Sequence, residues 1–420
     1  MSAAEIITLG CRLNIAESAA MAEAATDQAD LIIVNSCAVT AEAVRQTRQA
    51  IRKARRRRPD ARILVTGCAA QTEPAMFAAM PEVDRVLGNQ EKLLGTNSFA
   101  AAGRRLQVAD IMADGPMDRD AAPHRASAFS DRTRGFVVVQ NGCDHRCTFC
   151  IIPYGRGPSR SVPAGGVIDQ VRRLVDGGIR EIVLTGVDVT SYGADLPGRP
   201  SLGLLVERIL RAVPDLPRLR LSSLDGVEMD DRLFDLLTGE PRVMPHVHLS
   251  LQAGDDLILK RMKRRHSRAQ AIELVERLHA RRPDIAIGAD IIAGFPTEDD
   301  AMFANSLALV EQCSVVHGHV FPYSPRPDTP AARMPQVDPA VARERAARLR
   351  DACSAQRNKW LADHADTVVE ILVERSGKGG HARDFAPARL TAPAEPGKIV
   401  AARVVGLEKD GLIAQEVADA

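Results

Sequence analysis

The stretch NGCDHRCTFCIIPYGRGPSRS, residues 141–161, places three cysteines in the spacing C-x3-C-x2-C. Three thiolates on one short loop suit a [4Fe–4S] cluster, whose fourth iron stays open to another ligand. Zinc is the alternative, but structural zinc prefers four closed ligands from paired C-x2-C turns, and His145 is the one residue near enough to be a fourth ligand. The spacing therefore favours an iron–sulfur cluster held by Cys143, Cys147 and Cys150.

This cysteine loop follows the first of six expected strand–helix units. The strands are expected at residues 136–139, 181–184, 219–222, 246–251, 286–292 and 315–320, and a helix over 339–361 closes the series. Six such units in about 200 residues predict a partial (βα)6 barrel, related to the eight-unit barrel. Chemistry in such barrels gathers at the carboxyl ends of the strands, which is where the cysteine loop lies.

Residues 1–95 show a similar alternation of short apolar runs with Ala-rich, charged helical segments. The runs Glu5–Leu9, Leu31–Val34 and Ile63–Val65 are almost continuously apolar, as is typical of parallel strands buried on both faces. We therefore expect an α/β fold here, a doubly wound parallel sheet with helices on both faces. Residues 96–128 lose this rhythm and contain several Gly and Pro, so we interpret them as the domain tail and a linker.

Each of these three apolar runs leads into a cysteine, in ITLGC at Cys11, IVNSC at Cys37 and LVTGC at Cys68. The carboxyl ends of parallel strands meet at one edge of a sheet, so the three thiols can lie together. A single free cysteine is often a buried small apolar residue, but three in the same structural position favour a second three-thiolate cluster. Cys313 and Cys353 lie on expected helices without companions, and we expect both to be buried and inert.

The last segment, residues 363–420, changes to short apolar runs at 368–373, 399–405 and 412–414, separated by Gly-rich turns. This pattern predicts a small β-barrel of the kind that often binds nucleic acid. From Asp366 onward the chain holds seven Lys and Arg against nine Asp and Glu. A barrel with this balance would hold RNA through a local basic patch, or would face a basic protein.

Composition limits the class of protein. The 420 residues carry a net charge of +1, with 45% hydrophobic and 26% charged residues, the balance of a globular protein with a real core. No apolar run approaches the ~18–20 residues that a membrane span needs, and the first eleven residues lack the basic start of a secretory signal. We expect a cytoplasmic protein without a membrane partner, in which cysteines serve metal binding or catalysis rather than structural disulfides.

Together these features resemble the radical S-adenosylmethionine methylthiotransferases, over nearly the whole chain and in that family's three-domain order. TLGCRLN, VNSCAVT and VTGCAAQ resemble its N-terminal cluster domain, residues 129–362 its radical core, and residues 363–420 its TRAM domain. The phrases TGVDVTSYG, LRLSSLD, HLSLQAG and FPYSPRPDTPA are most similar to the branch that modifies N6-threonylcarbamoyladenosine at tRNA position 37.

The resemblance implies two [4Fe–4S] clusters and S-adenosyl-L-methionine as cofactors. The core cluster would bind S-adenosylmethionine and donate one electron to give a 5′-deoxyadenosyl radical, and no side chain would act as catalytic acid or base. The second cluster would hold the sulfur that is methylated and delivered to adenosine C2. The implied S-adenosylmethionine contacts are Phe149 and Phe321 beside the adenine, Gly186 and Val187 at the amino group, Ser222, Ser250 and Gln252 toward the ribose and methionine, and Arg264 at the carboxylate.

Two positions depart from the commoner family pattern. Asp188 often corresponds to Asn and Ala253 to Ser, so a polar role at these two positions is not implied. Arg326, just beyond the last barrel strand, could bind the carboxylate of the threonylcarbamoyl group in bidentate fashion, or could be an ordinary surface charge of a loop.

The implied partners are a tRNA anticodon stem-loop, an electron donor such as flavodoxin or ferredoxin, and a sulfur donor. Two alternatives share the chemistry, namely N6-isopentenyladenosine of tRNA and an aspartate of a small-subunit ribosomal protein. The slightly acidic tail favours the protein substrate, whereas the phrases of the core favour tRNA. An alternative of another class is a non-catalytic iron–sulfur RNA-binding module, which would not explain a six-unit barrel with polar strand ends.

Overall fold

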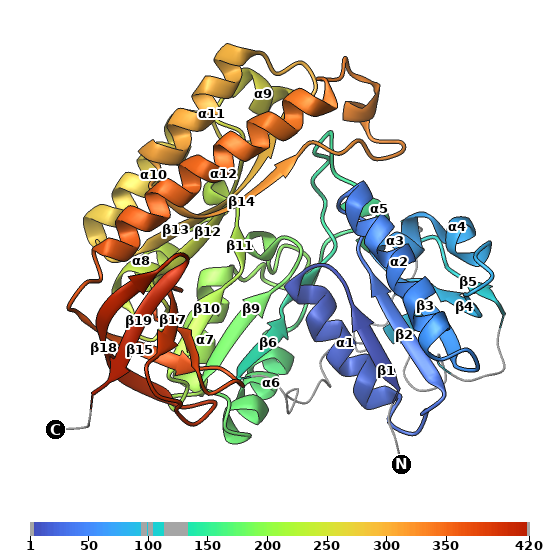
Figure 1. Cartoon of the computed structure of the whole chain (residues 1–420), viewed down its shortest axis with the longest axis horizontal. Helices are drawn as coiled ribbons and strands as arrows, with labels where there is room; N and C mark the ends of the chain where they lie inside the picture. The colour runs from blue at the N-terminus through green and yellow to red at the C-terminus, as the bar shows by residue number, and fades with distance from the viewer. Residues whose placement is uncertain (1–3, 94–98, 100–103, 113–132, 418–420) are drawn as a thin grey trace.

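The computed structural model describes residues 4–93, 99, 104–112 and 133–417. It consists of an N-terminal parallel sheet, a larger parallel barrel and a C-terminal β-barrel, in that order along the chain (Figure 1). Of the expected linker, residues 113–128 lie outside the described part, as do residues 96–98 and 100–103.

The N-terminal sheet is parallel, as expected, and its strand order follows the chain. Its strands are β1 (Glu5–Thr8), β2 (Leu31–Ser36), β3 (Arg62–Gly67), β4 (Arg85–Leu87) and β5 (Leu106–Gln107). Sequence reasoning did not find β4 and β5, which are only three and two residues long. The strand β5 lies in the stretch that we expected to be a domain tail and linker.

Helices cover both faces of this sheet. Ile32, Val34 and Val65 pack under α2 (Ala41–Arg57) and the short α3 (Cys68–Thr72) and α4 (Pro74–Ala78), whereas Ile33 and Leu64 on the other face pack against α1 (Arg12–Ala24). Two covered faces agree with the expected doubly wound sheet, but the strand order lacks the reversal that such sheets usually show.

The barrel has the expected partial (βα)6 architecture. Its parallel strands are β6 (Arg134–Val138), β9 (Glu181–Thr185), β10 (Arg218–Leu221) with its continuation β11 (Ser223–Leu224), β12 (His246–Gln252), β13 (Ala286–Ala293) and β14 (Val315–Pro322). Ser222 interrupts the third strand, which divides the barrel into a three-stranded and a four-stranded sheet.

Amphipathic helices surround these strands and pack on a Val- and Leu-rich core. They are α6 (Ala164–Asp176), α7 (Leu202–Ala212), α8 (Asp231–Gly239), α10 (Arg268–Arg281), α11 (Asp300–Gln312) and the closing α12 (Pro339–Ala362). Polar side chains cap most of their amino ends; at α10, Ser267 and Gln270 form a reciprocal capping box. The helix α8 was not predicted.

The C-terminal segment forms a closed five-stranded barrel, which confirms the expected small β-barrel. Its strands are β15 (Val368–Val373), β16 (Gly379–His381), β17 (Pro387–Leu390), β18 (Ile399–Glu408) and β19 (Gly411–Glu416). It lies at the amino ends of the barrel strands, where Arg134, the first residue of β6, pairs with Glu374 at 2.7 Å. None of the helices in the described part of the chain combines the length and apolar character needed to cross a bilayer.

Candidate functional site

The core cysteines lie on a loop between β7 (Gln140–Asn141) and α5 (Ile152–Arg156), just after β6. The Cys143 N–H donates to Gly157 O at 3.1 Å, and the Thr148 N–H donates to Met262 O at 3.1 Å. Gly142 has a positive φ of 75°, and a Cβ there would lie 1.9 Å from Pro158 O, so the close backbone crossing requires glycine. The fold therefore fixes this loop at the carboxyl end of the first barrel strand.

The three core cysteines are half-buried and lie near one another in a polar environment. Burial, with added repulsion from Asp188 and the two other core cysteines, raises the pKa of Cys143 to about 12. Burial also raises the pKa of Cys150 to about 12. The Asp188 carboxylate lies 3.8 Å from Cys143 Sγ, and Arg264 Nη1 donates to Cys147 Sγ at 3.6 Å. Thiols held in this way become ligands when a metal displaces their protons.

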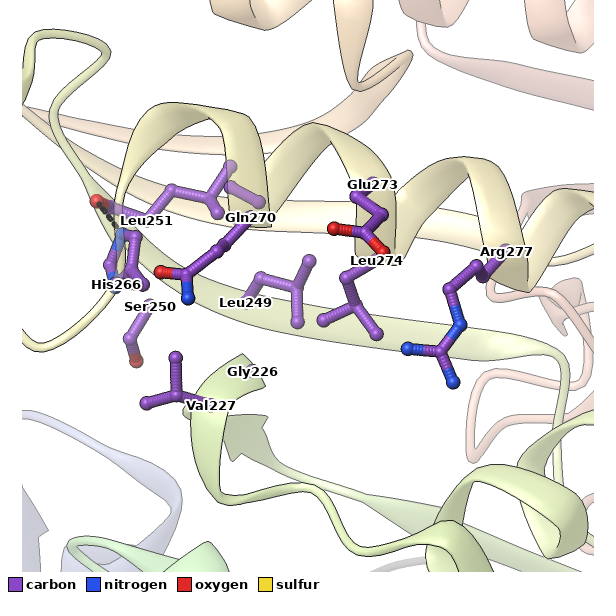
Figure 2. A pocket seen from close by; sticks show the side chains of 11 residues that line it. Gly226, Val227, Leu249, Ser250, Leu251, His266, Gln270, Glu273, Leu274 and Arg277 are labelled. Carbon is purple, nitrogen blue, oxygen red and sulfur yellow. Dashed lines mark hydrogen bonds between the residues drawn. The ribbon is translucent and has the colours of Figure 1, made fainter.

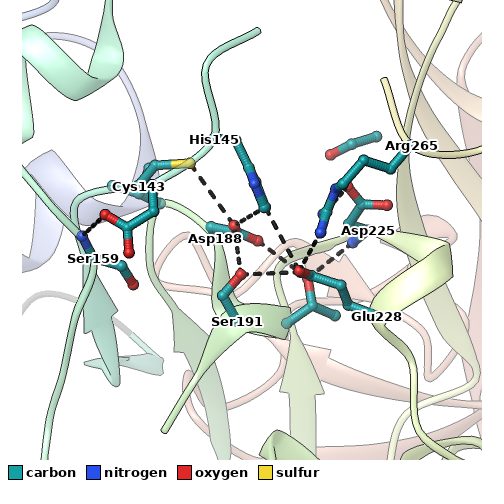
Figure 3. A network of polar contacts seen from close by, with 12 residues as sticks. Cys143, His145, Ser159, Asp188, Ser191, Asp225, Glu228 and Arg265 are labelled. Carbon is teal, nitrogen blue, oxygen red and sulfur yellow. Dashed lines mark hydrogen bonds and ion pairs between the residues drawn. The ribbon is translucent and has the colours of Figure 1, made fainter. Parts of the chain in front are cut away.

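A network of charged side chains borders the core cysteines (Figure 3). His145 Nε2 lies 2.8 Å from Asp188 and 3.6 Å from Glu228, and Arg265 pairs with Glu228 at 2.5 Å and with Asp225 at 2.9 Å. Hydrogen bonds to Asp188 and Glu228 raise the pKa of His145 to about 10. Ligand atoms of Cys143, His145 and Asp188 lie within 4.8 Å of one another, and His145 Nε2 pairs with Asp188.

The expected S-adenosylmethionine contacts lie at successive strand ends around this loop. Gly186 and Val187 follow β9, where Gln140 Oε1 accepts the N–H groups of Val187 at 3.1 Å and Asp188 at 2.8 Å. Arg264 donates to the Ser250 carbonyl at 3.1 Å and to Asp225 at 2.9 Å. These contacts place the backbone of β9, the end of β12 and Arg264 beside the core cysteines.

Several of these groups have unused hydrogen-bonding capacity. The buried atoms Ser222 Oγ, Asp225 Oδ1 and Arg264 Nε have no hydrogen-bond partner among the described residues. Gln252, at the end of β12, has a positive φ of 67°, a strained backbone conformation that it shares with seven other non-glycine residues of the described chain. This set contains a hydrogen-bond donor and acceptors without partners, which fits a ligand that carries an amino group, a carboxylate and hydroxyls.

Phe149 and Phe321, the two residues expected beside the adenine of S-adenosylmethionine, lie in different surroundings. Phe149 packs edge-on against Phe295 with ring centroids 6.4 Å apart, whereas Phe321, on β14, is 40% exposed. Ala253, where the family often has Ser, is buried in an apolar cluster that includes Phe295 and Met262. Asp188, where the family often has Asn, has a polar role in the network with His145.

The N-terminal cysteines come together at one edge of the first sheet. Cys11 directly precedes α1, Cys37 follows β2, and Cys68 begins α3 immediately after β3. A Cβ on Gly10 would lie 2.9 Å from Cys37 Cβ, so the Cys11 turn closely approaches Cys37. Burial, with smaller contributions from Cys68 and Cys11, raises the pKa of Cys37 to about 11.

A buried network of ion pairs connects the N-terminal cysteine site to the barrel domain. Arg156, in the GRG sequence after the core cysteines, donates from Nε to Cys68 Sγ at 3.0 Å. It also pairs with Glu17 on α1 and donates to Asn14, and Lys92 lies 2.6 Å from Glu17. Against the effect of burial, Arg156 and Lys92 lower the pKa of Glu17 to about 2.

Sequence reasoning missed this network because its members lie far apart in the chain. A signal was present in α1, where Asn14, Glu17 and Ser18 are buried polar residues at helical spacing on one face. Such a face has to meet polar partners, here Arg156, Lys92 and Asn35.

The two cysteine sites face each other. A Cβ on Gly155 would lie 3.4 Å from Cys68 Cβ, and Asn89 donates to the Gly155 carbonyl while its amide lies 4.0 Å from Cys68 Sγ. Cys68 also contributes to the raised pKa of Cys150, which places the two sets of thiols within electrostatic reach.

A separate pocket of about 210 Å³ lies between β12, α10 and η5 (Gly226–Glu228) (Figure 2). Leu249, Leu251 and Leu274 give it an apolar floor, and Gln270 and Arg277 line its polar side. Ser250 is the one expected contact residue in its lining, and no cysteine of the described chain lines it.

Arg326 is 4% exposed and pairs with Glu73 at 2.6 Å, between the barrel and the N-terminal domain. The interpretation of Arg326 as an ordinary surface charge of a loop is therefore wrong. Its alternative role as a carboxylate ligand would have to compete with Glu73.

Comparisons with known proteins cover both cysteine sites. A model of the Radical SAM superfamily matches residues 137–310, and one of the Uncharacterized protein family UPF0004 matches residues 3–88. Threonylcarbamoyladenosine tRNA methylthiotransferase MtaB of Rickettsia prowazekii is 48% identical over 96% of this chain and 95% of its own. MtaB of Bacillus subtilis is 36% identical, over 88% and 84% of the two chains.

The chain is also similar to an enzyme named for a different nucleoside and to a solved structure with the same fold. The tRNA-2-methylthio-N(6)-dimethylallyladenosine synthase of Erythrobacter litoralis is 35% identical over 88% of this chain and 86% of its own. The solved structure of the radical S-adenosylmethionine methyltransferase TsrM from Kitasatospora setae has a TM-score of 0.50 at 18% identity. It covers 72% of this chain and 66% of that one, which supports the fold.

Proposed function

The chain belongs to the radical S-adenosylmethionine tRNA methylthiotransferases, and we propose on this basis that it adds a methylthio group to C2 of N6-threonylcarbamoyladenosine at position 37 of tRNA. The observation that carries the proposal is the pair of facing three-cysteine sites, one in each matched region. The identity of 48% to a threonylcarbamoyladenosine enzyme, against 35% to a dimethylallyladenosine enzyme, favours the first nucleoside as substrate.

The enzyme uses S-adenosylmethionine and [4Fe–4S] clusters, as its family does. Cys143, Cys147 and Cys150 would hold one cluster, and Cys11, Cys37 and Cys68 the other. When bound, these groups supply radical chemistry at an unreactive C–H bond and a methylated sulfur, which no side chain can provide.

The chain's own residues bind and orient these groups. Arg264 would meet the methionine carboxylate with its unused Nε, and Asp225 Oδ1 and Ser222 Oγ offer acceptors for amino and hydroxyl groups. Gln140 holds the backbone at Gly186 and Val187 in place. Phe149, Ser250, Gln252 and Phe321 would complete the site.

Three partners accompany this proposal. The tRNA anticodon stem-loop presents an unpaired adenosine, as sequence-specific RNA recognition usually requires. Reductive cleavage needs one electron, so an electron donor such as flavodoxin or ferredoxin is required, and the added sulfur requires a sulfur donor. A cytoplasmic location follows from the tRNA substrate.

We assign residues 1–95, extended by β5 to Gln107, to the N-terminal cluster domain and residues 129–362 to the radical core. Residues 363–420, which include the closed barrel of β15–β19, would serve as a TRAM domain that contacts tRNA. Its docking at the amino ends of the barrel strands leaves their carboxyl ends, where the cysteines lie, to the N-terminal domain.

Anaerobic reconstitution with iron, sulfide, S-adenosylmethionine and dithionite tests the function. Mass spectrometry should detect a methylthio product on tRNA that carries N6-threonylcarbamoyladenosine, and none on tRNA that carries isopentenyladenosine or on the ribosomal protein. Turnover of only one of the latter two would contradict the assigned substrate. The absence of 5′-deoxyadenosine would indicate a non-catalytic iron–sulfur module.

A further inference from the structure

The interior of the barrel collects charged side chains from three parts of the molecule. Arg134 and Arg220 project from β6 and β10, and Arg12 reaches in from the first turn of α1. Their guanidinium carbons lie 5.4, 4.8 and 5.8 Å, respectively, from the ring centroid of Phe385, a residue of the C-terminal barrel. Three cations therefore surround one aromatic ring.

The nearby carboxylates are already paired with other residues. Glu181 accepts from Arg134 and from Arg220, each at 2.9 Å. Asp290, on β13, lies 3.1 Å from His248 and 3.4 Å from His319. Glu374 pairs with Arg134 and His381, so all three of these carboxylates have partners other than Arg12.

Arg12 forms no hydrogen bond and no ion pair with any residue that the structure describes. Its strongest electrostatic neighbours are Arg220 and Arg134, which outweigh the attraction of Glu181 and Asp290. The first turn of α1 carries no acidic side chain, so the helix amino end adds further positive potential. A partly buried cation in such surroundings lacks an anion.

Arg12 also occupies a suitable place for a substrate contact. It follows Cys11 directly in the chain, so its backbone belongs to the N-terminal cysteine site while its guanidinium extends into the barrel. A nucleoside whose C2 faces that site would carry its N6 substituent several ångströms farther away. The threonylcarbamoyl group bears a carboxylate at its end, whereas the isopentenyl group is apolar.

We propose that Arg12 binds the carboxylate of the threonylcarbamoyl group and thereby selects this nucleoside over isopentenyladenosine. The proposal rests on the proposed function and names the residue that determines its specificity. A planar guanidinium can bind a carboxylate in bidentate fashion, which would supply the missing anion. An isopentenyl group would instead leave the partly buried Arg12 without an anion. Arg326, the other candidate, is already paired with Glu73.

A pair of anticodon stem-loops isolates this contact in the reconstituted holoenzyme. One carries N6-threonylcarbamoyladenosine with its free carboxylate, and the other carries the methyl ester, which removes the charge and retains the rest of the group. Fluorescence anisotropy gives the two Kd values, and single-turnover assays give the two rates of methylthiolation. We expect the wild type to bind the free acid about 10- to 100-fold more tightly than the ester.

In Arg12→Gln that ratio should fall to near one, with the iron content unchanged. Arg12→Lys retains the charge without the bidentate geometry and should give an intermediate ratio, which also tests the proposal if the Gln variant does not fold. Arg326→Gln and the exposed Arg172→Gln are matched controls that should keep the wild-type ratio.

Two results would overturn the proposal, namely equal binding of acid and ester by the wild type, or an Arg12→Gln variant that keeps the wild-type ratio. A wild-type holoenzyme that binds the acid preferentially but methylthiolates neither stem-loop would instead contradict the proposed function.

Discussion

The two cysteine sites are built in opposite ways. The core site takes all its thiols from one loop of eight residues, Cys143–Cys150, whereas the N-terminal site takes one thiol from the end of each of three strands. A buried cation, Arg156, lies 3.0 Å from Cys68 in the N-terminal site. A partly buried anion, Asp188, lies 3.8 Å from Cys143 in the core site.

This difference separates a local site from an assembled one. The core loop depends on nearby backbone contacts, so it should form whenever the barrel forms. The N-terminal site needs the whole sheet and also Arg156 from the other domain, so it is complete only when the two domains are docked. Disturbing the domain interface should therefore affect sulfur insertion before it affects S-adenosylmethionine cleavage.

The largest expected effect comes from removing cysteines. If both sites hold [4Fe–4S] clusters, the holoenzyme contains about eight irons, and Cys147→Ala or Cys37→Ala should each retain about half. Both should abolish methylthiolation. A triple Cys11→Ala, Cys37→Ala, Cys68→Ala variant should still form 5′-deoxyadenosine, measured by chromatography, because its core site is intact.

Cys313→Ala is the matched control for these variants. Cys313 is buried at the carboxyl end of α11 and belongs to neither cysteine site. It should keep its iron and its activity. Zinc in place of iron after anaerobic purification, or methylthio product from the triple variant at the wild-type rate, would contradict the two-cluster assignment.

The next effect concerns the ion network of the assembled site. Glu17→Gln leaves Arg156 and Lys92 buried without their shared anion, which should cost about 3–5 kcal/mol of stability at the domain interface. Denaturant unfolding should show an earlier first transition, and the iron of the N-terminal site should be lost first. Glu42→Gln, in an exposed pair with Arg45, should leave both measurements unchanged. Equal loss of iron from both sites would show that the N-terminal site does not depend on the domain interface more than the core site does.

The same carboxylate predicts a pH dependence. The folded protein holds the pKa of Glu17 at about 2, below its ordinary value of 4.5. The contribution of a lowered carboxyl pKa is present above pH 4.5 and is lost as the pH falls toward 2, by about 3 kcal/mol in total. Unfolding measured across this window should show a smaller slope in Glu17→Gln than in the wild type. Identical slopes would mean that Glu17 does not titrate as the buried network requires.

The same contrast explains what could be predicted from the sequence. The core site lies within one short stretch, so the spacing of its cysteines alone indicated its chemistry. The cysteines at the ends of the apolar runs predicted the second cysteine site, at the edge of the N-terminal sheet. The Glu17–Arg156 pair spans 139 residues and depends on how two domains dock, which no local pattern encodes. Short strands such as β4 and β16 were missed because three residues show no periodicity.

The smallest expected effect tests the domain interface through Arg326 and Glu73. Arg326 is buried and Glu73 is partly exposed, so Arg326→Gln should cost about 1–2 kcal/mol, between the ranges for exposed and buried pairs. Because the pair joins the barrel loop to the N-terminal domain, the loss should loosen the assembled site and leave the core loop intact. Methylthiolation should fall a few-fold while 5′-deoxyadenosine formation stays at the wild-type rate.

A double variant with Glu73→Gln should be no less stable than Arg326→Gln alone, since the two residues act as one pair. Additive losses, or an equal fall of both reactions, would show that this contact does not hold the two cysteine sites together.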